Sequence, residues 1–269
     1  MAGQSGDAIG VGVLGMGSMG RAHCSAFRRI AQVRPGAAPH LMALACRSAE
    51  TGRAFAARFG FAAWRERWED LIADQQITLF DNTGPNAVHA EPCIAAARAG
   101  KHLLCEKPLA RNATEAYRML EAVRAAGVVH MCGFNYRFLP AVRLAKQLIA
   151  EGRLGRVLQF RARYLQSLLA DPEFPFRRAD EGTALAGFRR IEVTDAAHPF
   201  VAQWWPRHPL GWDQTFVHEI GCLLDAIEGR GTVAPYGATF DDGYRAAVIC
   251  DAIAASAEKG TSVAIRYAE

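Results

Sequence analysis

The feature that most constrains the fold is a glycine-rich segment near the amino terminus. Residues 9–14 have the pattern of a short apolar strand, residues 15–20 spell G-x-G-x-x-G, and a helix-like stretch then runs to about Ile30. Such glycines permit a tight turn and close approach of a pyrophosphate, and the helix supplies N–H donors and a positive dipole. We expect a dinucleotide site, the plainer alternative being a strand–turn–helix of small residues. Its residues would be Gly15, Gly17, Ser18, Met19 and Gly20.

Strand and helix patterns alternate through the first half of the chain. Strand patterns follow at 41–47, 77–83, 101–105 and 128–134, and helix patterns at 49–59, 87–99 and 113–126. This alternation predicts a doubly wound parallel sheet, which binds ligands at the carboxyl ends of its strands. We predict an α/β fold with a Rossmann NAD(P)-binding domain over residues 1–135. His23, just after the glycines, either faces the cofactor or packs beneath it.

The end of the second predicted strand bears on the choice of cofactor. An NAD enzyme usually carries an acid there to hold the ribose diol. This chain has Arg47 and Ser48 instead, with Glu50 just beyond. A guanidinium and a hydroxyl suit a 2′-phosphate, which favours NADP slightly over NAD. In the alternative, Arg47 is a solvated cation and Glu50 or backbone groups hold the ribose.

A lysine stands at the end of the strand predicted at 101–105. Arginine is the common cation of this chain, because only four of its 31 basic residues are lysines. A lysine can release its proton near neutral pH when it is buried, and an arginine cannot. We therefore expect Lys107, in the run Glu-Lys-Pro at 106–108, to lie in the cofactor cleft and take part in proton transfer. The alternative is a surface cation on a loop.

Further motifs follow the glycine-rich segment in a fixed order. They are T-G-P-N at 83–86 with His89, A-G-K-H at 99–102, E-K-P at 106–108 and N-Y-R at 135–137. Together they resemble the glucose–fructose oxidoreductase, inositol dehydrogenase and rhizopine-catabolism family (Gfo/Idh/MocA). The resemblance covers Ile9 to Gln166, and Gly84 departs from the commonest form of its turn.

The resemblance implies hydride transfer between NAD(P) and a secondary alcohol of a sugar, inositol or related polyol. It places Lys107 beside the nicotinamide and the reacting carbinol, as the catalytic residue. The further cofactor-binding residues would be Arg47, Ser48, Thr83, Asn86, His89, Glu106, Asn135 and Arg137. The substrate-binding residues would be Lys107, Tyr136, Gln166, His198 and His208. The last two flank tryptophans that either stack on a sugar or pack in a core. No metal site is expected.

Residues 136–269 are predicted to form an α+β domain for substrate binding and oligomerisation, with an incomplete antiparallel sheet. We expect a helix at 141–151, a strand after Gly155 and a closing helix at 244–258. Near 180–188 about a hundred residues of the family pattern are absent, among them its catalytic histidine. Three explanations stay open: a stretch missing from the sequence, a true deletion, or a smaller domain with another role. A true deletion would favour a catalytically inactive dinucleotide-binding protein that serves as a sensor or partner subunit.

The composition excludes some classes of protein. The net charge of +4 is spread along the chain, so neither a nucleic acid nor a membrane surface is expected as partner. No apolar run approaches the ~20 residues that span a bilayer. The seven cysteines are an odd number without metal-ligand spacing, which indicates reduced thiols and a cytoplasmic protein. We expect a homo-oligomer.

Overall fold

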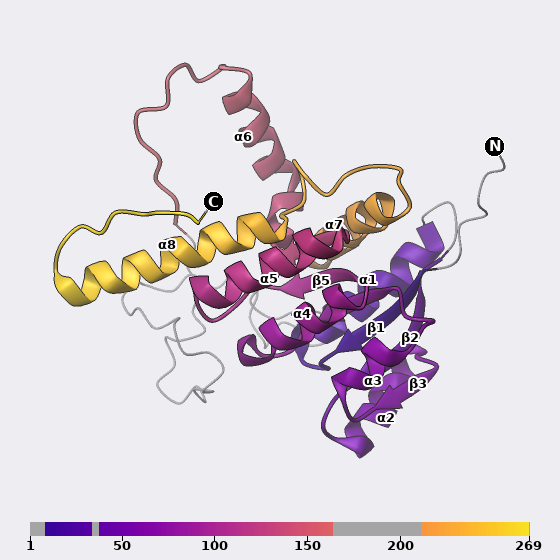
Figure 1. Cartoon of the computed structure of the whole chain (residues 1–269). Coiled ribbons are helices and arrows are strands. Elements are labelled where there is room, and N and C mark those ends of the chain that lie inside the picture. The colour runs from indigo at the N-terminus through magenta and orange to yellow at the C-terminus, as the bar shows by residue number, and fades with distance from the viewer. Residues whose placement is uncertain (1–8, 34–37, 164–210, 269) are drawn as a thin grey trace, which may run out of the picture.

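The computed structural model describes residues 9–33, 38–163 and 211–268. Its centre is a parallel sheet of six strands in the order β3-β2-β1-β4-β5-β6 (Figure 1). The order reverses direction between β1 and β4, and a doubly wound sheet binds its ligand outside the strand ends at that point. The predicted α/β class and Rossmann topology are confirmed.

The elements fall close to the predicted bounds. The strands are β1 (Gly10–Leu14), β2 (His40–Ala45), β3 (Ala63–Arg65), β4 (Leu79–Asn82), β5 (His102–Glu106) and β6 (His130–Gly133). The α-helices are α1 (Ser18–Val33), α2 (Ala49–Phe59), α3 (Trp68–Ala73), α4 (Ala90–Arg98), α5 (Ala113–Ala126), α6 (Pro140–Ala150), α7 (Trp212–Ile227) and α8 (Phe240–Lys259). Two 3₁₀ turns, η1 (Asn86–Val88) and η2 (Asn135–Phe138), complete the described elements.

Three differences from the predicted elements have local causes. The edge strand β3 was not predicted, because three residues are too few to show a period of two. The helix predicted to begin at residue 87 begins later, because Asn86 opens η1 and α4 starts only after His89. β6 begins at His130, two residues later than predicted, because the paired register of this strand with β5 runs from His130 to Gly133.

Helices cover both faces of the sheet. One apolar cluster joins α1, α2 and α7 to the sheet, and a second joins α3, α4, α5 and α8. Phe216 and Ile220 of α7 are fully buried against the first half of the chain, as is Phe240 of α8. Helices from beyond residue 211 therefore complete the layers of the Rossmann sheet. The domain division at residue 135 stays a prediction.

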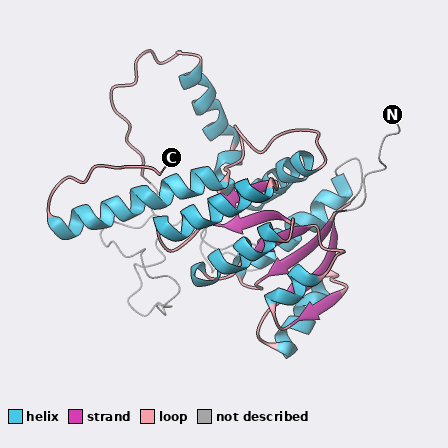
Figure 2. Cartoon of the chain, in the orientation of Figure 1, coloured by secondary structure: helices cyan, strands magenta, loops and turns pink. Residues whose placement is uncertain are grey.

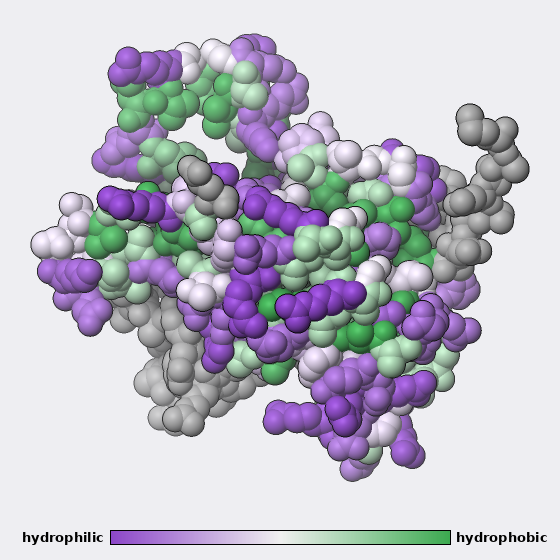
Figure 3. All heavy atoms as spheres, in the orientation of Figure 1, coloured by the Kyte–Doolittle hydropathy of each residue, from purple (hydrophilic) through white to green (hydrophobic). Residues whose placement is uncertain are grey.

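The segment that follows η2 lies apart from this core. Helix α6 is present as predicted, yet Val142 and Leu144 are exposed, and so are Leu158 and Phe160 in the loop after it. Figure 2 draws that loop without a strand, and Figure 3 shows hydrophobic side chains along it. The strand predicted after Gly155 is wrong for residues 156–163, because a strand needs a partner to pair with and no described residue supplies one.

Residues 136–163 and 211–268 contain no strand, so the predicted antiparallel sheet is not found in them. One isolated antiparallel bridge joins Cys132 to Ala238. The part of that prediction which falls on 164–210 lies outside the described residues. No helix in the described ranges is long and apolar enough to cross a membrane. All seven cysteines are free thiols, as predicted.

Candidate functional site

The glycine-rich turn leaves a backbone cradle beside α1. Gly15 has a φ of 102°, which favours glycine. A Cβ on Gly20 would lie 2.5 Å from the carbonyl oxygen of Gly15, so a side chain there would push the turn and helix apart. A Cβ on Gly17 would meet nothing within 4 Å. The open space at Gly17 and the first N–H groups of α1, which opens at Ser18, fit a pyrophosphate.

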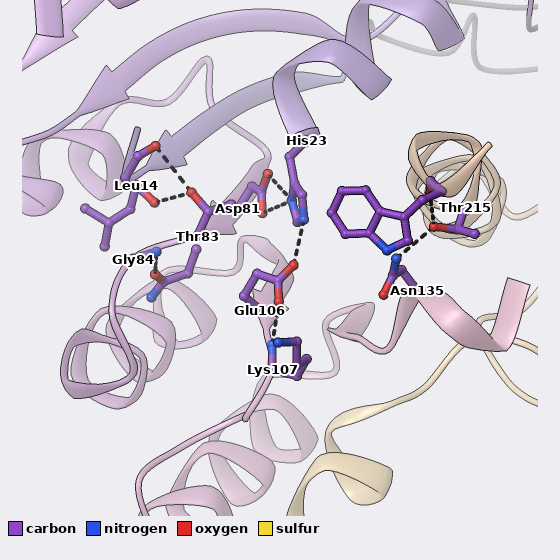
Figure 4. A network of polar contacts seen from close by, with 12 residues as sticks. Leu14, His23, Asp81, Thr83, Gly84, Glu106, Lys107, Asn135 and Thr215 are labelled. Carbon is purple, nitrogen blue, oxygen red and sulfur yellow. Dashed lines mark hydrogen bonds and ion pairs between the residues drawn. The ribbon is translucent and has the colours of Figure 1, made fainter. Parts of the chain in front are cut away.

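Strand register brings the other turns to the same edge of the sheet. Leu14 pairs with Asn82, and Asn82 with Cys105, so the chain leaves β1, β4 and β5 in one row. Thr83 joins the first two turns, because its hydroxyl donates to the carbonyl oxygen of Leu14 at 2.9 Å (Figure 4). The glycine-rich turn and the turn after β4 thus form one wall, as the sequence predicted.

Asn82 shapes the turn after β4, and sequence reasoning missed it. Its side-chain amide donates to the carbonyl oxygen of Val88 at 2.9 Å, and its side-chain oxygen accepts from the backbone N–H of Gly84 at 3.1 Å. These bonds hold η1 against the strand end. Asn86, which the sequence assigned to cofactor binding, begins η1 and is half-buried. The signal for Asn82 was its place as the last residue of a buried strand.

His89 joins two of these turns from beneath. Its ring nitrogens lie 2.9 Å from the carbonyl oxygen of Gly84 and 2.9 Å from that of Pro108. The side chain has no exposed surface in the structure. A direct contact between His89 and a cofactor, which we predicted, would need this pair of contacts to open. What His89 does in the structure is hold the turns after β4 and β5 together.

Lys107 stands where β5 ends, next to a cis peptide bond to Pro108. Its side chain is exposed, so the burial that we expected is not supplied by the described residues. Its backbone N–H donates to Oε2 of Glu106 at 2.9 Å. The amine therefore projects from a fixed backbone position at the ligand edge of the sheet, and it is open to an incoming molecule.

A buried charge network lies beneath Lys107. Glu106 accepts from Nε2 of His23 at 3.1 Å, and Nδ1 of His23 lies 3.0 Å from a carboxylate oxygen of Asp81. Burial is the largest single effect on the pKa of Glu106 and raises it. The hydrogen bond and charge of His23, together with Lys107, lower this pKa by more, so its net shift is downward. Glu106 is 4% exposed and His23 fully buried, so His23 packs beneath the site rather than facing it.

The N-Y-R motif is largely occupied with internal contacts. Asn135 donates to the hydroxyl of Thr215 at 2.8 Å, which links η2 to α7 (Figure 4). Arg137 pairs with Asp242 of α8 at 2.8 Å. Tyr136 is half-buried beside them. Asn135 and Arg137 therefore hold α7 and α8 in place, and a cofactor contact by either one stays a prediction.

The predicted ribose end of the site is open. Arg47 and Ser48 are exposed directly after β2. No hydrogen bond or ion pair with a described residue engages the guanidinium of Arg47. Trp64 of β3 donates to the carbonyl oxygen of Cys46 at 3.2 Å and so holds the residue that follows β2 in place. A phosphate or a diol could reach this corner.

Three predicted substrate residues, Gln166, His198 and His208, lie outside the described residues. Among the residues that are described, no cluster of histidine, cysteine, aspartate or glutamate could hold a metal ion. The candidate site as described is therefore a glycine-rich turn joined to its neighbouring turns, with one projecting amine.

Comparison with known proteins agrees with this geometry. The sequence profile named GFO_IDH_MocA, described as an oxidoreductase family with an NAD-binding Rossmann fold, matches residues 9–134. Levoglucosan dehydrogenase of Pseudarthrobacter phenanthrenivorans is 39% identical over 218 residues, which are 75% of this chain and 56% of that protein. 1,5-Anhydro-D-fructose reductase of Ensifer adhaerens is 38% identical over 150 residues, 55% of this chain and 44% of that protein. The chain thus spans about half the length of these curated relatives.

Solved structures give the same answer. A levoglucosan dehydrogenase in complex with NADH and levoglucosan has a TM-score of 0.81 at 29% identity. That match covers 97% of this chain and 100% of the other. The glycine cradle, the projecting lysine and these similarities agree. The chain belongs to the Gfo/Idh/MocA oxidoreductase family through its NAD-binding Rossmann domain.

Proposed function

We propose that the protein is an NAD(P)-dependent dehydrogenase that acts on a secondary alcohol of a sugar or related polyol. The observation that carries the proposal is the convergence of three turns on one sheet edge. Thr83 ties the glycine-rich turn to the turn after β4, and His89 ties that turn to Pro108, next to Lys107. The substrate class is supported by the relatives, whose names include a levoglucosan dehydrogenase and an inositol 2-dehydrogenase.

The chain's own groups would divide the work in the following way. The backbone at Gly17 and the N–H groups of α1 would bind the pyrophosphate. A bound nicotinamide would supply the acceptor for the hydride that leaves the substrate carbon. Lys107 would take the hydroxyl proton as that carbon becomes a carbonyl, so that one C–H and one O–H bond break and one C=O bond forms. Solvent then receives the proton from the exposed amine.

We further propose that the cofactor is NADP, or NADP as well as NAD. Arg47 offers the 2′-phosphate a guanidinium that no described residue engages, and Ser48 adds a hydroxyl. The relatives' names point both ways: one solved structure holds NADH, and a scyllo-inositol 2-dehydrogenase of Bacillus subtilis, 35% identical over 126 residues (47% of this chain, 38% of that protein), is named for NADP⁺.

The proposal is tested first by binding and then by turnover. Purified protein is titrated with NADH and NADPH, and binding is followed by nicotinamide fluorescence. A panel of anhydrosugars, aldoses and inositols is then screened for the absorbance of reduced nicotinamide. We expect saturable binding and turnover of at least one member. Binding without turnover of any member would favour the inactive dinucleotide-binding protein, and absence of binding would reject both.

The role of Lys107 is tested by Lys107→Met, with Lys259→Met as the matched control. Lys259 is exposed in the last turn of α8. We expect Lys107→Met to lower kcat by about a hundredfold, within the usual range for losing an acid–base group. The control should keep the activity of the unmodified chain. Equal activities in the two variants would remove Lys107 from the mechanism.

A further inference from the structure

An imidazole lies buried between two carboxylates directly beneath the candidate site. His23 comes from α1, the helix whose amino end forms the glycine cradle. Its Nδ1 lies 3.1 and 3.0 Å from the two oxygens of Asp81 on β4, and its Nε2 lies 3.1 Å from Oε1 of Glu106 on β5. None of the three side chains is more than 5% exposed. Figure 4 shows His23 in contact with both carboxylates, Asp81 beside the ring and Glu106 below it.

The chain of hydrogen bonds continues from Glu106 to the backbone of Lys107. Oε1 of Glu106 accepts from His23, and Oε2 accepts from the backbone N–H of Lys107. A Cβ on Gly133 would lie 3.3 Å from the carboxyl group of Glu106, so a glycine at position 133 leaves room for the Glu106 side chain. Glu106 is therefore fixed at both oxygens. The orientation of the Glu106 carboxylate therefore depends on His23, and so does the position of the Lys107 backbone N–H that donates to it.

Two carboxylates facing two ring nitrogens favour a doubly protonated ring. A neutral imidazole has one donor and one acceptor nitrogen, whereas an imidazolium donates from both. Burial lowers the pKa of His23, but Asp81 and Glu106 outweigh it, and the pKa is raised well above its ordinary value of 6.5. Burial raises the pKa of Asp81, and His23 opposes part of that rise.

The other titratable groups around the ring do not replace this pairing. Glu219 of α7 is fully buried, and no described residue forms a hydrogen bond with its carboxyl oxygens. Burial raises its pKa well above 4.5, which favours the neutral acid over a competing negative charge. Cys24 of α1 and Cys132 of β6 are thiols whose pKa values burial also raises. Lys107 is the cation on the open side.

An apolar wall closes the remaining side of the ring. The ring of Phe216 on α7 lies with its centroid 5.3 Å from that of His23. Both ring nitrogens therefore have their hydrogen-bond partners within the protein. In such surroundings a missing partner costs more than the bond contributes, because the buried group that remains cannot be solvated.

We propose that His23, as an imidazolium, is a positioning residue: by donating to Glu106 it fixes the Glu106–Lys107 turn relative to the helix that forms the glycine cradle. The inference rests on the proposed dehydrogenase function for its catalytic consequence. Its structural half, the coupling of His23 to the Lys107 backbone, holds without that function and can be measured without substrate.

Two substitutions separate the contacts of the ring. In His23→Asn the side-chain amide stands near the place of Nδ1 and keeps a donor for Asp81. In His23→Gln the longer side chain reaches toward the place of Nε2 and keeps a donor for Glu106. His102→Asn serves as control: His102 opens β5 at the opposite edge, and its Nδ1 accepts from the backbone N–H of Val129 at 3.1 Å. All three variants are made in the full chain, and circular dichroism verifies folding.

The first readout is hydrogen exchange at the backbone amide of Lys107. We expect His23→Asn to lower its protection about tenfold relative to His23→Gln, and His102→Asn to leave it unchanged. The second is the ¹⁵N NMR spectrum of the histidine rings in the unmodified chain, assigned by loss of the signal in His23→Gln. We expect both nitrogens of His23 to stay protonated at pH values above the ordinary histidine pKa of 6.5.

The third readout is kinetic. We expect kcat in His23→Asn to fall about tenfold below that of His23→Gln, while the Kd for NADH differs less than about threefold. Equal Lys107 protection in the two variants, or a neutral His23 ring, would overturn the proposal. Should both variants unfold, the ring spectrum of the unmodified chain decides alone. An absence of turnover with the expected exchange result would count against the proposed function and leave the positioning role intact.

Discussion

The hydroxyl of Thr83 donates to the carbonyl oxygen of Leu14 at 2.9 Å and so joins the turns that leave β4 and β1. The backbone N–H of Thr83 donates to the same oxygen, also at 2.9 Å. Thr83→Val keeps the shape of the side chain and the backbone bond, and it removes the hydroxyl. We expect a loss of about 1 kcal/mol in the free energy of unfolding and about a fivefold rise in the Kd for NADH, because the cradle loosens.

A matched control exists on the same strand pair. The hydroxyl of Thr78 donates to the carbonyl oxygen of Gly10 at 3.4 Å, at the other edge of the sheet. Thr78→Val should leave the Kd for NADH unchanged. Urea titration gives the stabilities and fluorescence titration the affinities. Equal affinities in both valine variants would show that Thr83 supports the fold without shaping the cleft.

Alanine substitution should affect the two glycines of the cradle differently, one in its affinity for NADH and the other in its stability. A Cβ on Gly17 touches no protein atom within 4 Å, whereas one on Gly20 would lie 2.5 Å from a backbone oxygen. We expect the free energy of unfolding of Gly17→Ala to lie within about 0.5 kcal/mol of that of the unmodified chain. We expect its affinity for NADH to fall at least about tenfold, because the methyl group occupies the place of the pyrophosphate. Gly20→Ala should lose about 2 kcal/mol or more. Thermal unfolding and NADH titration check both, and normal affinity in Gly17→Ala would place the pyrophosphate elsewhere.

Arg47 should set the preference between the two nicotinamide cofactors. Arg47→Ala removes a charge that faces solvent after β2, so we expect the KM for NADP to rise about tenfold and the KM for NAD to change less than about twofold. Arg98→Ala, at the exposed end of α4, is the control for charge loss alone. A parallel rise for both cofactors would show that Arg47 contacts no 2′-phosphate.

Glu219 should make the unfolding free energy depend on pH. Burial raises its pKa well above 4.5, so the folded state holds this proton more tightly than the unfolded state does. The resulting stabilisation is fully present below pH 4.5 and is lost as the pH rises through the raised pKa of the folded state. Glu219→Gln cannot lose that proton. We therefore expect the variant to gain stability relative to the unmodified chain as the pH rises from 4.5 toward neutrality.

Denaturant titrations at a series of pH values give the difference between the two proteins. Asp225→Asn, on the same helix and half-buried, is the control for loss of a carboxylate. A difference between Glu219→Gln and the unmodified chain that does not vary with pH would mean that Glu219 titrates as it does in the unfolded chain.

The sequence predicted the parts of the site that depend on strand order. The glycine-rich segment, the turn after β4 and Lys107 each follow a strand of a parallel sheet, so their meeting at one edge follows from topology alone. The roles of His89, Asn135 and Arg137 could not be predicted in the same way. Each forms its contacts with residues whose approach depends on tertiary packing, such as Pro108, Thr215 and Asp242.

The buried network shows the same limit. Asp81 lies inside a strand and His23 inside a helix, and neither position differs in sequence pattern from an ordinary core residue. Glu219 comes from α7, far along the chain. The exposure of Lys107 was also beyond sequence reasoning, because burial at a strand end depends on what covers it. Local pattern fixes which edge a residue reaches, and packing decides whether it faces the cleft or the core.

The packing of α7 and α8 on the first half has a consequence for synthesis. Phe216 and Ile220 cover the face of the sheet that carries α1, and Phe240 covers the other face. A ribosome must therefore release the chain beyond residue 240 before both apolar faces of the nascent sheet are shielded from water. Until then the emerging half presents uncovered hydrophobic surface, which makes it prone to aggregation during synthesis.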